Sequence, residues 1–304
     1  MNAKGRRKLA LFFLIIILTI PLINIFWQSF QKSIWDGQHH LTVAVDNGNL
    51  DIWSLEPSEK KIVHVTVPGN TYLSVGSYGE YRAAAVGKLS LLERKNGQLI
   101  VDAIEDSFVI PIDGVVVLKE DVKEKLTFEN MFGLGGALQV LGAVSMQNVA
   151  YSNLSLVDII RLWFFSFQVN KSSIKNIDLA LSTSLSKTTL PDGKEGFTID
   201  NLRFSQEAEE YFNDKGIKDD ALTIEILNAT TKEGRANMLA SLLTTIGGNV
   251  VNTAKNDITE KETKIFAKDK SYTAWKIAKL TGGKQVFEAP KRGRADILVI
   301  LGGK

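Results

Sequence analysis

The pattern of apolar and charged positions begins with a basic tail followed by one long uncharged run. Residues 4–8 (KGRRK) carry four cations, and residues 9–27 carry no charge. At about 1.5 Å rise per residue, a helix of this length crosses the hydrocarbon core of a bilayer. We therefore expect a transmembrane helix over 9–27 after a cytoplasmic basic tail, 1–8, because cations favour the cytoplasmic side.

The uncharged run could instead form a buried core helix or a cleaved signal peptide. A signal peptide requires a small-residue cleavage site, whereas the run ends in the bulky sequence NIFWQSF. Trp27 and Phe30 are the aromatic residues expected at a membrane interface. These features favour an uncleaved single-pass anchor, with residues 28–304 outside the cytoplasm and the protein in the cell membrane.

Short alternating segments follow the anchor. We expect residues 28–40 to form a juxtamembrane linker and three strands to follow at 41–45, 50–55 and 61–67. Asn47 and Gly48 predict a tight hairpin turn between the first two strands. The pattern therefore predicts an antiparallel meander at the start of a domain spanning residues 41–206.

The middle of the chain mixes helical periodicity with an uncharged stretch. Residues 88–107 have helical spacing, with a division into two helices possible at Asn96-Gly97, and 107–118 predict strand, turn and strand. Residues 130–157 carry no charge, and we expect a buried or groove-lining helix, a second membrane span being the alternative. Residues 155–169 predict a helix that begins at an N-cap serine.

The last part of the chain has the clearest alternation. The charged run 207–220 predicts a solvated connector. Residues 221–304 predict the order β-α-β-β-α-β-β, with helices at 232–246 and 271–280. The final strand, 295–301, is apolar almost throughout, as in a strand covered on both faces. The fold class is therefore α/β, with a small C-terminal α/β sandwich.

Composition excludes several kinds of chemistry. Four of the 36 basic residues precede the anchor and no acidic residue does, so the outer part has 32 basic against 34 acidic residues, a formal charge of −2. This near-neutral balance does not indicate the basic surface that nucleic-acid binding requires. The chain has no cysteine and three histidines, and we expect His39 and His40 to be a solvated pair and His64 to pack in a strand. We predict no metal site.

Few residues suggest a ligand site. Asn228 ends a strand and can bond backbone groups in the following turn, and the helix start near Arg235 could bind an anion. A capped turn with an exposed arginine is the alternative. Asp46 and Asp51 flank the hairpin turn and could face each other. No G-x-S-x-G, P-loop or H-E-x-x-H motif occurs.

Several motifs together indicate a family. The stretch DIWSLEPSEKKIVHVTVPGNTYLSV, with TVPGNT at 66–71, resembles the LytR–CpsA–Psr family, in which this strand ends in an SIPRDT-like motif. GQLIVDAIEDSFVIPIDGVVVL and SNLSLVDIIRL are similar to later segments of that domain, so the resemblance covers about 41–180. In the last domain ILNAT at 226–230, GRA at 234–236 and ADILVILG at 295–302 resemble the LytR C-terminal domain.

The resemblance implies both a location and a reaction. Enzymes of this family have a cytoplasmic N-terminus, one membrane helix and an outer domain that transfers glycopolymers from polyprenyl-pyrophosphate carriers to peptidoglycan. Their arginines grip the pyrophosphate and their aspartates hold Mg²⁺. Here Gly69 and Asn70 stand at the arginine and aspartate of the motif, and Asp46-Asn47-Gly48 lacks the arginine of the family's Asp-x-Arg signature. A bidentate arginine is not replaced by a distant lysine.

We therefore predict a non-catalytic envelope protein, with no catalytic residue, that binds or organises cell-wall glycopolymer through a degenerate family domain. The expected partners are the lipid bilayer and peptidoglycan or polyprenyl-linked glycopolymer, and the uncharged stretch 130–157 could provide a lipid-facing groove. One alternative is an active Mg²⁺-dependent phosphotransferase with rearranged basic residues such as Arg82, Lys88 and Arg161. Another is a membrane-tethered regulator or scaffold. The candidate ligand-binding residues are Asn70, Arg82, Arg161, Asn228 and Arg235.

Overall fold

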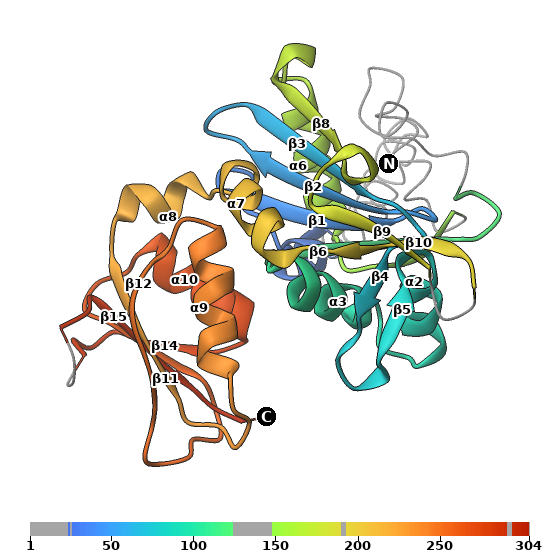
Figure 1. Ribbon diagram of the computed structural model, residues 1–304. Coiled ribbons are helices and arrows are strands. Elements are labelled where there is room, and N and C mark those ends of the chain that lie inside the picture. Colours follow the sequence, from blue (N-terminus) through green and yellow to red (C-terminus); the bar gives the residue numbers. More distant parts are fainter. Residues whose placement is uncertain (1–23, 25, 124–147, 190–192, 291–293, 304) are drawn as a thin grey trace, which may run out of the picture.

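The computed structural model describes residues 24, 26–123, 148–189, 193–290 and 294–303. They form two α/β domains joined by helices α7 and α8 (Figure 1). The basic tail and nearly all of the expected membrane helix, and most of the uncharged stretch 130–157, lie outside the described residues. Within the described residues no helix combines the length and the apolar character needed to cross a bilayer.

The first domain is built on a six-stranded sheet in the order β7-β6-β1-β2-β3-β8. The predicted antiparallel meander is confirmed, since β1 pairs with β2 and β2 with β3, while β6 and β8 join the two sides in parallel. All residues of β1 and β2 are buried, so both strands are covered on both faces. The strands are β1 (Leu41–Asp46), β2 (Leu50–Glu56), β3 (Lys61–Val67), β6 (Gly114–Leu118), β7 (Val149–Ser152) and β8 (Ile174–Asp178).

Helices cover the two faces of this sheet. Helices α2 (Ala83–Leu92) and α3 (Gln98–Phe108) share one core with Ala44, Ile52 and Val65, whereas α6 (Leu156–Ser166) packs with Val43, Val45 and Trp53 on the other face. Ser155 is the N-cap of α6, as predicted, and it forms a capping box with Asp158. Smaller elements complete the domain: β4 (Tyr72–Ser74), η1 (Gly76–Tyr78), β5 (Glu80–Arg82), η2 (Lys171–Ser173), η3 (Leu179–Leu181), β9 (Leu185–Thr189) and β10 (Glu195–Ile199).

The region 88–118 confirms one prediction and corrects another. The division at Asn96-Gly97 is confirmed, and Gly97, at φ 77°, is the N-cap residue of α3. The first of the two strands predicted within 107–118 does not form, because α3 extends to Phe108, whose side chain is almost fully buried. The helix then ends at Val109 in the left-handed conformation, φ 57°. Only the second predicted strand, β6, forms.

The charged run 207–220 joins the two domains, but it is helical and partly buried rather than fully solvated. Residues Asn201–Tyr211 form α7 and Lys215–Asp220 form α8. Phe204, Ala208 and Phe212 are fully buried in the core of the first domain, so the acidic residues occupy only the outer face of α7. Charge density concealed an apolar stripe at helical spacing.

The last domain has the predicted order of elements. Its sheet runs β12-β11-β15-β13-β14, with helices α9 (Arg235–Thr245) and α10 (Tyr272–Thr281) packed on it. Its strands are β11 (Thr223–Asn228), β12 (Asn249–Lys255), β13 (Lys264–Ala267), β14 (Lys284–Val286) and β15 (Ile297–Leu301). β11 and β15 are parallel neighbours, so their carboxyl ends lie at the same edge.

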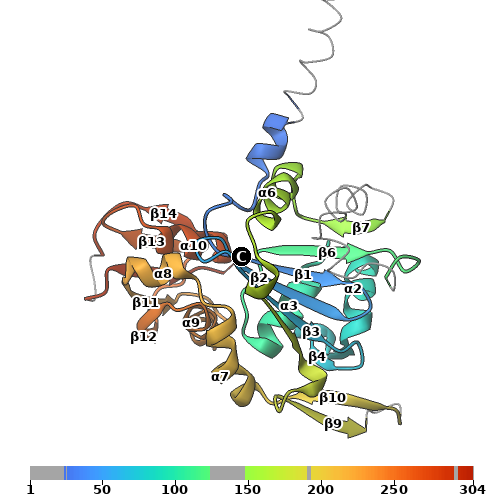
Figure 2. The same cartoon turned by 90° about the horizontal axis from the view of Figure 1, so that it is seen from above.

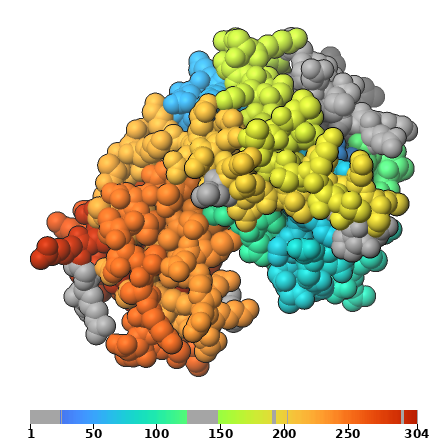
Figure 3. All heavy atoms as spheres, viewed as in Figure 1, coloured from blue at the N-terminus to red at the C-terminus, as the bar shows by residue number. Residues whose placement is uncertain are grey.

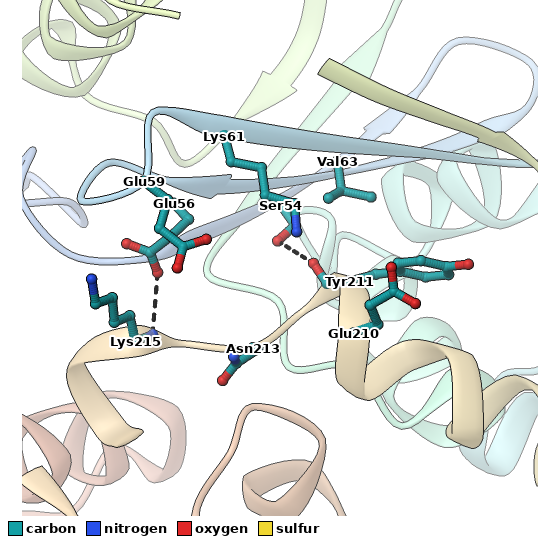
Figure 4. A pocket seen from close by; sticks show the side chains of 9 residues that line it. All are labelled: Ser54, Glu56, Glu59, Lys61, Val63, Glu210, Tyr211, Asn213 and Lys215. Carbon is teal, nitrogen blue, oxygen red and sulfur yellow. Dashed lines mark hydrogen bonds between the residues drawn. The ribbon is translucent and has the colours of Figure 1, made fainter. Parts of the chain in front are cut away.

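Buried polar contacts hold the two domains together. Lys276 Nζ of α10 lies 2.8 Å from both carboxylate oxygens of Asp113, in the loop before β6, and both side chains are at most 6% exposed. On another part of the interface, Ser54 donates to the Tyr211 carbonyl and Glu56 accepts from the Lys215 backbone nitrogen (Figure 4). The domains therefore form a joined unit rather than two tethered bodies.

The predicted solvated histidine pair is wrong. His40 is buried, its Nε2 lies 2.8 Å from Ser54 Oγ, and burial lowers the pKa of His40 to about 3. His39 stacks on Tyr272 of the last domain, with ring centroids 3.9 Å apart. His64 stacks on Trp53, in agreement with the expected strand packing. Two histidines in a polar stretch thus occupy or border the domain interface.

The linker predicted at 28–40 is bound to α6. Asp158 accepts hydrogen bonds from Ser33 Oγ at 2.6 Å and from the Trp35 backbone nitrogen at 3.0 Å. Trp35 is 3% exposed and packs edge-on against Phe165. Residues 26–31 form a helical segment beside α6 (Figure 2). The segment that precedes the first strand is therefore part of the folded domain.

Candidate functional site

The first candidate site lies where β1 ends beside the parallel strand β6, the position at which the family resemblance expects acidic and basic ligand groups. Asp46, the last residue of β1, is fully buried, and Lys123 Nζ lies 3.1 Å from both of its carboxylate oxygens. The backbone nitrogen of Gly48 donates to Asp46 at 3.1 Å. This strand-end carboxylate is therefore already bonded within the protein.

The surroundings of Asp46 are closely packed. An added Cβ at Gly87 of α2 would lie 1.8 Å from Asp46 Oδ2, so only glycine lets the helix approach the carboxylate. Burial raises the pKa of Asp46, and the neighbouring Lys123 acts against that rise. Glu120, which is largely exposed, also lies 3.0 Å from Lys123. The lysine thus joins a buried acid to a solvent-facing one.

Asp46 and Asp51 do not face each other. Asp46 pairs with Leu50 and Val45 with Asp51, so the two carboxylates are on opposite faces of the hairpin. Asp51 instead accepts from Asn47 Nδ2 at 2.6 Å and lies 3.2 Å from His64 Nε2. Across the described residues, no three acidic or histidine side chains gather as a metal-binding group.

Gly69 occupies a position that excludes a side chain. An added Cβ there would lie 2.3 Å from the Gly48 backbone carbonyl oxygen, too close for any other residue without a backbone shift. The Gly69 backbone nitrogen donates to Asn49 Oδ1 at 2.8 Å, which ties the loop after β3 to the hairpin turn. The arginine that the family motif has here is absent, and this backbone leaves no room for it.

Asn70 and Arg82 lie close to that loop. Asn70 Nδ2 donates to the Glu195 carbonyl oxygen at 3.4 Å. The backbone carbonyl oxygen of Asn70 accepts from the Phe197 backbone nitrogen at 3.2 Å. Arg82 ends β5 and is the N-cap residue of α2. Both residues thus belong to the loops around the strand ends, and their predicted ligand role stays a prediction.

Arg161 lies elsewhere, on α6 at the opposite face of the sheet from α2. Its Nη1 donates to Ser33 Oγ at 2.8 Å and to the Trp35 carbonyl oxygen, and its guanidinium lies 5.5 Å from the Phe30 ring centroid. These contacts fasten the linker to the domain. The structure therefore separates Arg161 from Asn70 and Arg82.

Asn228 and Arg235 lie at the carboxyl edge of the last sheet. Asn228 Oδ1 accepts from the Thr230 nitrogen and hydroxyl at 3.0 and 2.7 Å, and its amide donates to the Lys232 carbonyl at 2.8 Å. These are the backbone contacts that the sequence suggests for a turn-forming asparagine. Arg235 is the first residue of α9, and its side chain lines a cleft that faces the first domain.

That cleft has a volume of about 910 Å³ and separates α3 and η1 from the start of α9 and the end of β15. Figure 3 shows the surface hollowed between the orange last domain and the cyan part of the first. Asp102, Glu105 and Asp106 line it from α3. Burial raises the pKa of Glu105 to about 7 and also raises the pKa of Asp106, where Arg235 acts in the opposite direction.

Sequence reasoning missed Lys123, and it considered Glu105 only as half of a neighbouring carboxylate pair with Asp106. Lys123 lies in a charged stretch, which ordinarily indicates a solvated loop, and its pairing with Asp46 spans 77 positions. Glu105 is one of three acids on a helix whose apolar stripe faces the core. The one available signal was the position of Asp46 at the end of a buried strand, since a carboxylate there needs a partner.

Comparison with known proteins bears mainly on the last domain. Residues 221–304 match the family model LytR_C, described as LytR cell envelope-related transcriptional attenuator. The last domain is therefore a LytR C-terminal domain, which confirms the resemblance seen in its motifs. No curated protein sequence matches this chain.

Several solved structures have some likeness to the chain. B. subtilis TagT is 16% identical, with a TM-score of 0.40, and the alignment covers 58% of this chain and 91% of that one. The LytR-CPS2A-psr family protein YwtF (TagT) with bound octaprenyl pyrophosphate lipid is 18% identical, with a TM-score of 0.39 and the same coverages. B. subtilis TagU is 13% identical, with a TM-score of 0.39, over 57% of this chain and 97% of that one.

Proposed function

We propose that this is a single-pass, membrane-anchored protein of the cell envelope that binds or organises cell-wall glycopolymer without transferring it. The LytR C-terminal domain supports the envelope role. The uncharged run 9–27 after four cations supports the anchor and the outward orientation of both domains. The proposed partners are the lipid bilayer and peptidoglycan or polyprenyl-linked glycopolymer.

One observation carries the non-catalytic part of the proposal, the closed backbone at Gly69. Pyrophosphate transfer requires groups that neutralise charge on the diphosphate, and a bidentate arginine is well suited to that task. The 2.3 Å distance between an added Cβ at position 69 and the Gly48 oxygen excludes that arginine from its motif position. Asp46 is bonded to Lys123, so the strand-end carboxylate and cation satisfy each other.

Binding without transfer can use the loops around the strand ends. Asn70 follows Gly69 directly in the chain, and Arg82 lies two positions before Ala84, whose backbone nitrogen donates to the Gly69 carbonyl at 3.0 Å. We propose that Asn70 and Arg82 contact polymer there. A glycopolymer offers hydroxyl and anionic groups, for which an amide and a guanidinium are suitable donors. The candidate residues of the last domain are separate from this contact.

The test uses the full-length protein in detergent micelles with two measurements. Co-sedimentation with purified cell walls, with and without their attached polymer, measures binding, and a polyprenyl-pyrophosphate-linked substrate with Mg²⁺ measures transfer. We expect retention by polymer-bearing walls, weaker retention of Arg82→Ala, and no turnover. Lys95→Ala, an exposed change just after α2, serves as the matched control for binding.

Each other result refutes part of the proposal. Mg²⁺-dependent turnover that Arg82→Ala or Lys88→Ala abolishes would establish the phosphotransferase alternative. Equal retention by stripped and polymer-bearing walls would remove the glycopolymer from the proposal, and a protein partner without any wall retention would favour a scaffold. Protease protection of an N-terminal tag in sealed right-side-out vesicles tests the orientation; digestion of that tag from outside would contradict it.

A further inference from the structure

The cleft between the two domains has the dimensions and position of a small-ligand site. Its volume of about 910 Å³ lies within the range of ligand pockets. It opens outside the carboxyl ends of the parallel strands β11 and β15, where open α/β sheets commonly bind ligands. Both domains contribute walls, and the Lys276–Asp113 ion pair holds those domains in one arrangement.

The charges of the cleft are separated between its walls. The first domain contributes three acids, Asp102, Glu105 and Asp106. The last domain contributes a mainly basic wall, which consists of Lys232, Arg235, Lys284 and a single acid, Glu262. A ligand that spans the cleft therefore meets negative charge at one end and positive charge at the other.

Uncharged groups between these walls can bond a peptide backbone. Hydroxyl groups of Ser77, Thr230, Thr231, Thr263 and Thr281 line the cleft, together with the glycine backbone at 282–283 and 302–303. The amide nitrogens of these glycines already donate within the last domain, so hydroxyl oxygens and backbone carbonyl oxygens are the groups that can accept from a peptide. Met238, Leu239 and Leu242 add an apolar strip on α9 that suits short aliphatic side chains.

We propose that this cleft binds a short peptide with a free ammonium group and a free carboxylate, with the ammonium at the acidic wall of α3 and the carboxylate at Lys232 and Arg235. The inference goes beyond the proposed polymer contact at the strand ends and uses different residues. A polyanion is disfavoured because three carboxylates line one wall. A neutral sugar is disfavoured because none of the described lining residues is aromatic, so no ring is present for a sugar face to stack on.

The probe is trialanine, titrated calorimetrically into the full-length protein in detergent. N-acetyl-trialanine lacks the ammonium and trialanine amide lacks the carboxylate, so each removes the charge at one end. We expect saturable binding of trialanine and at least about tenfold weaker binding of each capped peptide, because charge-assisted hydrogen bonds are the strong ones. Equal binding of the capped and free peptides would overturn the proposal.

Variants assign the ends of the ligand. Arg235→Gln should weaken the binding of trialanine by about tenfold and leave the binding of trialanine amide unchanged. Asp106→Asn should weaken the binding of trialanine by about tenfold and leave the binding of N-acetyl-trialanine unchanged. Arg203→Gln, an exposed change on α7, is the matched control and should bind as the parent does. Melting curves of each variant distinguish lost binding from lost folding.

Two further outcomes separate this inference from the proposed function. Binding of a wall disaccharide that Arg235→Gln abolishes, with no binding of trialanine, would show a sugar site and refute the peptide assignment. Retention of the Arg235→Gln variant on polymer-bearing walls measures the strand-end contact independently. If the parent protein binds no trialanine but is retained on polymer-bearing walls, the peptide assignment has failed. If it binds trialanine but is not retained on those walls, the proposed polymer contact has failed.

Discussion

Replacing Lys123 with methionine removes the partner of a fully buried carboxylate. At 3.1 Å and an effective dielectric constant of about 20, the Lys123–Asp46 attraction is about 5 kcal/mol. Asp46 can limit the loss by taking up a proton. Protonation at pH 7 of a group with an unfolded pKa of 3.8 costs about 4 kcal/mol, so we expect about 3–4 kcal/mol of destabilisation.

The pH dependence of Lys123→Met follows from the same reasoning. Without Lys123, the folded pKa of Asp46 lies far above the unfolded value of 3.8, so the folded protein binds more protons. Its stability then falls as the pH rises above about 4. We expect a melting temperature roughly 6–16 °C below the parent at pH 7, and a much smaller difference near pH 4.

The assay is differential scanning calorimetry of four variants beside the parent. Lys123→Met should be destabilised, and Asp46→Asn/Lys123→Met should recover most of the loss because no charge stays buried. Gly87→Ala should resemble Lys123→Met, since its Cβ displaces the Asp46 carboxylate. Lys119→Met is the control, an exposed neighbouring lysine that should change stability by less than about 0.5 kcal/mol. A Lys123→Met protein that melts as the parent does at pH 7 would refute the account of this pair.

Four other predictions concern stability and the domain interface. Lys276→Met leaves Asp113 buried without its cation, and calorimetry should show a lower melting temperature, by the equivalent of about 3–5 kcal/mol, that Asp113→Asn in the same chain largely restores. Glu105→Gln should stabilise the protein at pH 8 by up to about 3 kcal/mol, because the raised pKa of about 7 makes ionisation of Glu105 costly in the folded state. This gain should disappear below about pH 4.5. A stability difference between variant and parent that does not change with pH would contradict the prediction. Because the pKa of His40 is lowered to about 3, this histidine should cost the parent about 2 kcal/mol of stability between pH 6.5 and 5, and His40→Gln should remove that loss. The same fall in melting temperature with pH in variant and parent would count against this. Arg161→Ala should speed limited proteolysis in the linker, whereas cleavage at the parental rate would show that the guanidinium contacts are dispensable.

Local patterns predicted the elements whose signal lies in neighbouring residues. The hairpin at Asn47-Gly48, the N-cap at Ser155 and the βαββαββ order of the last domain all depend on contacts within a few positions. Such contacts are short in sequence, so propensity and periodicity describe them well. The predicted turn at Asn228 has the same local origin.

The parts that the sequence did not predict depend on distant partners. The polar stretch around His40 predicts a solvated side chain, but in the structure Ser54 and the last domain cover it. The charged stretch that contains α7 hides an apolar stripe, because Phe204 and Phe212 are separated by acids on the outer face. The pairing of Lys123 with Asp46 and that of Lys276 with Asp113 join residues far apart in the chain. The cleft likewise exists only because the two domains are held together.

The bound linker connects the segment before the first strand to both domains. Its Ser33–Trp35 segment is bonded to α6 of the first domain, while His39 stacks on Tyr272 of the last. With residues 9–27 in the bilayer as proposed, the chain that leaves the membrane is bonded to the folded domains and is not a flexible linker. The height of the cleft above the membrane and its facing direction are then set by the protein. A pull on a polymer bound at Asn70 and Arg82 would then reach the proposed anchor through the first domain, whose α6 bonds the linker.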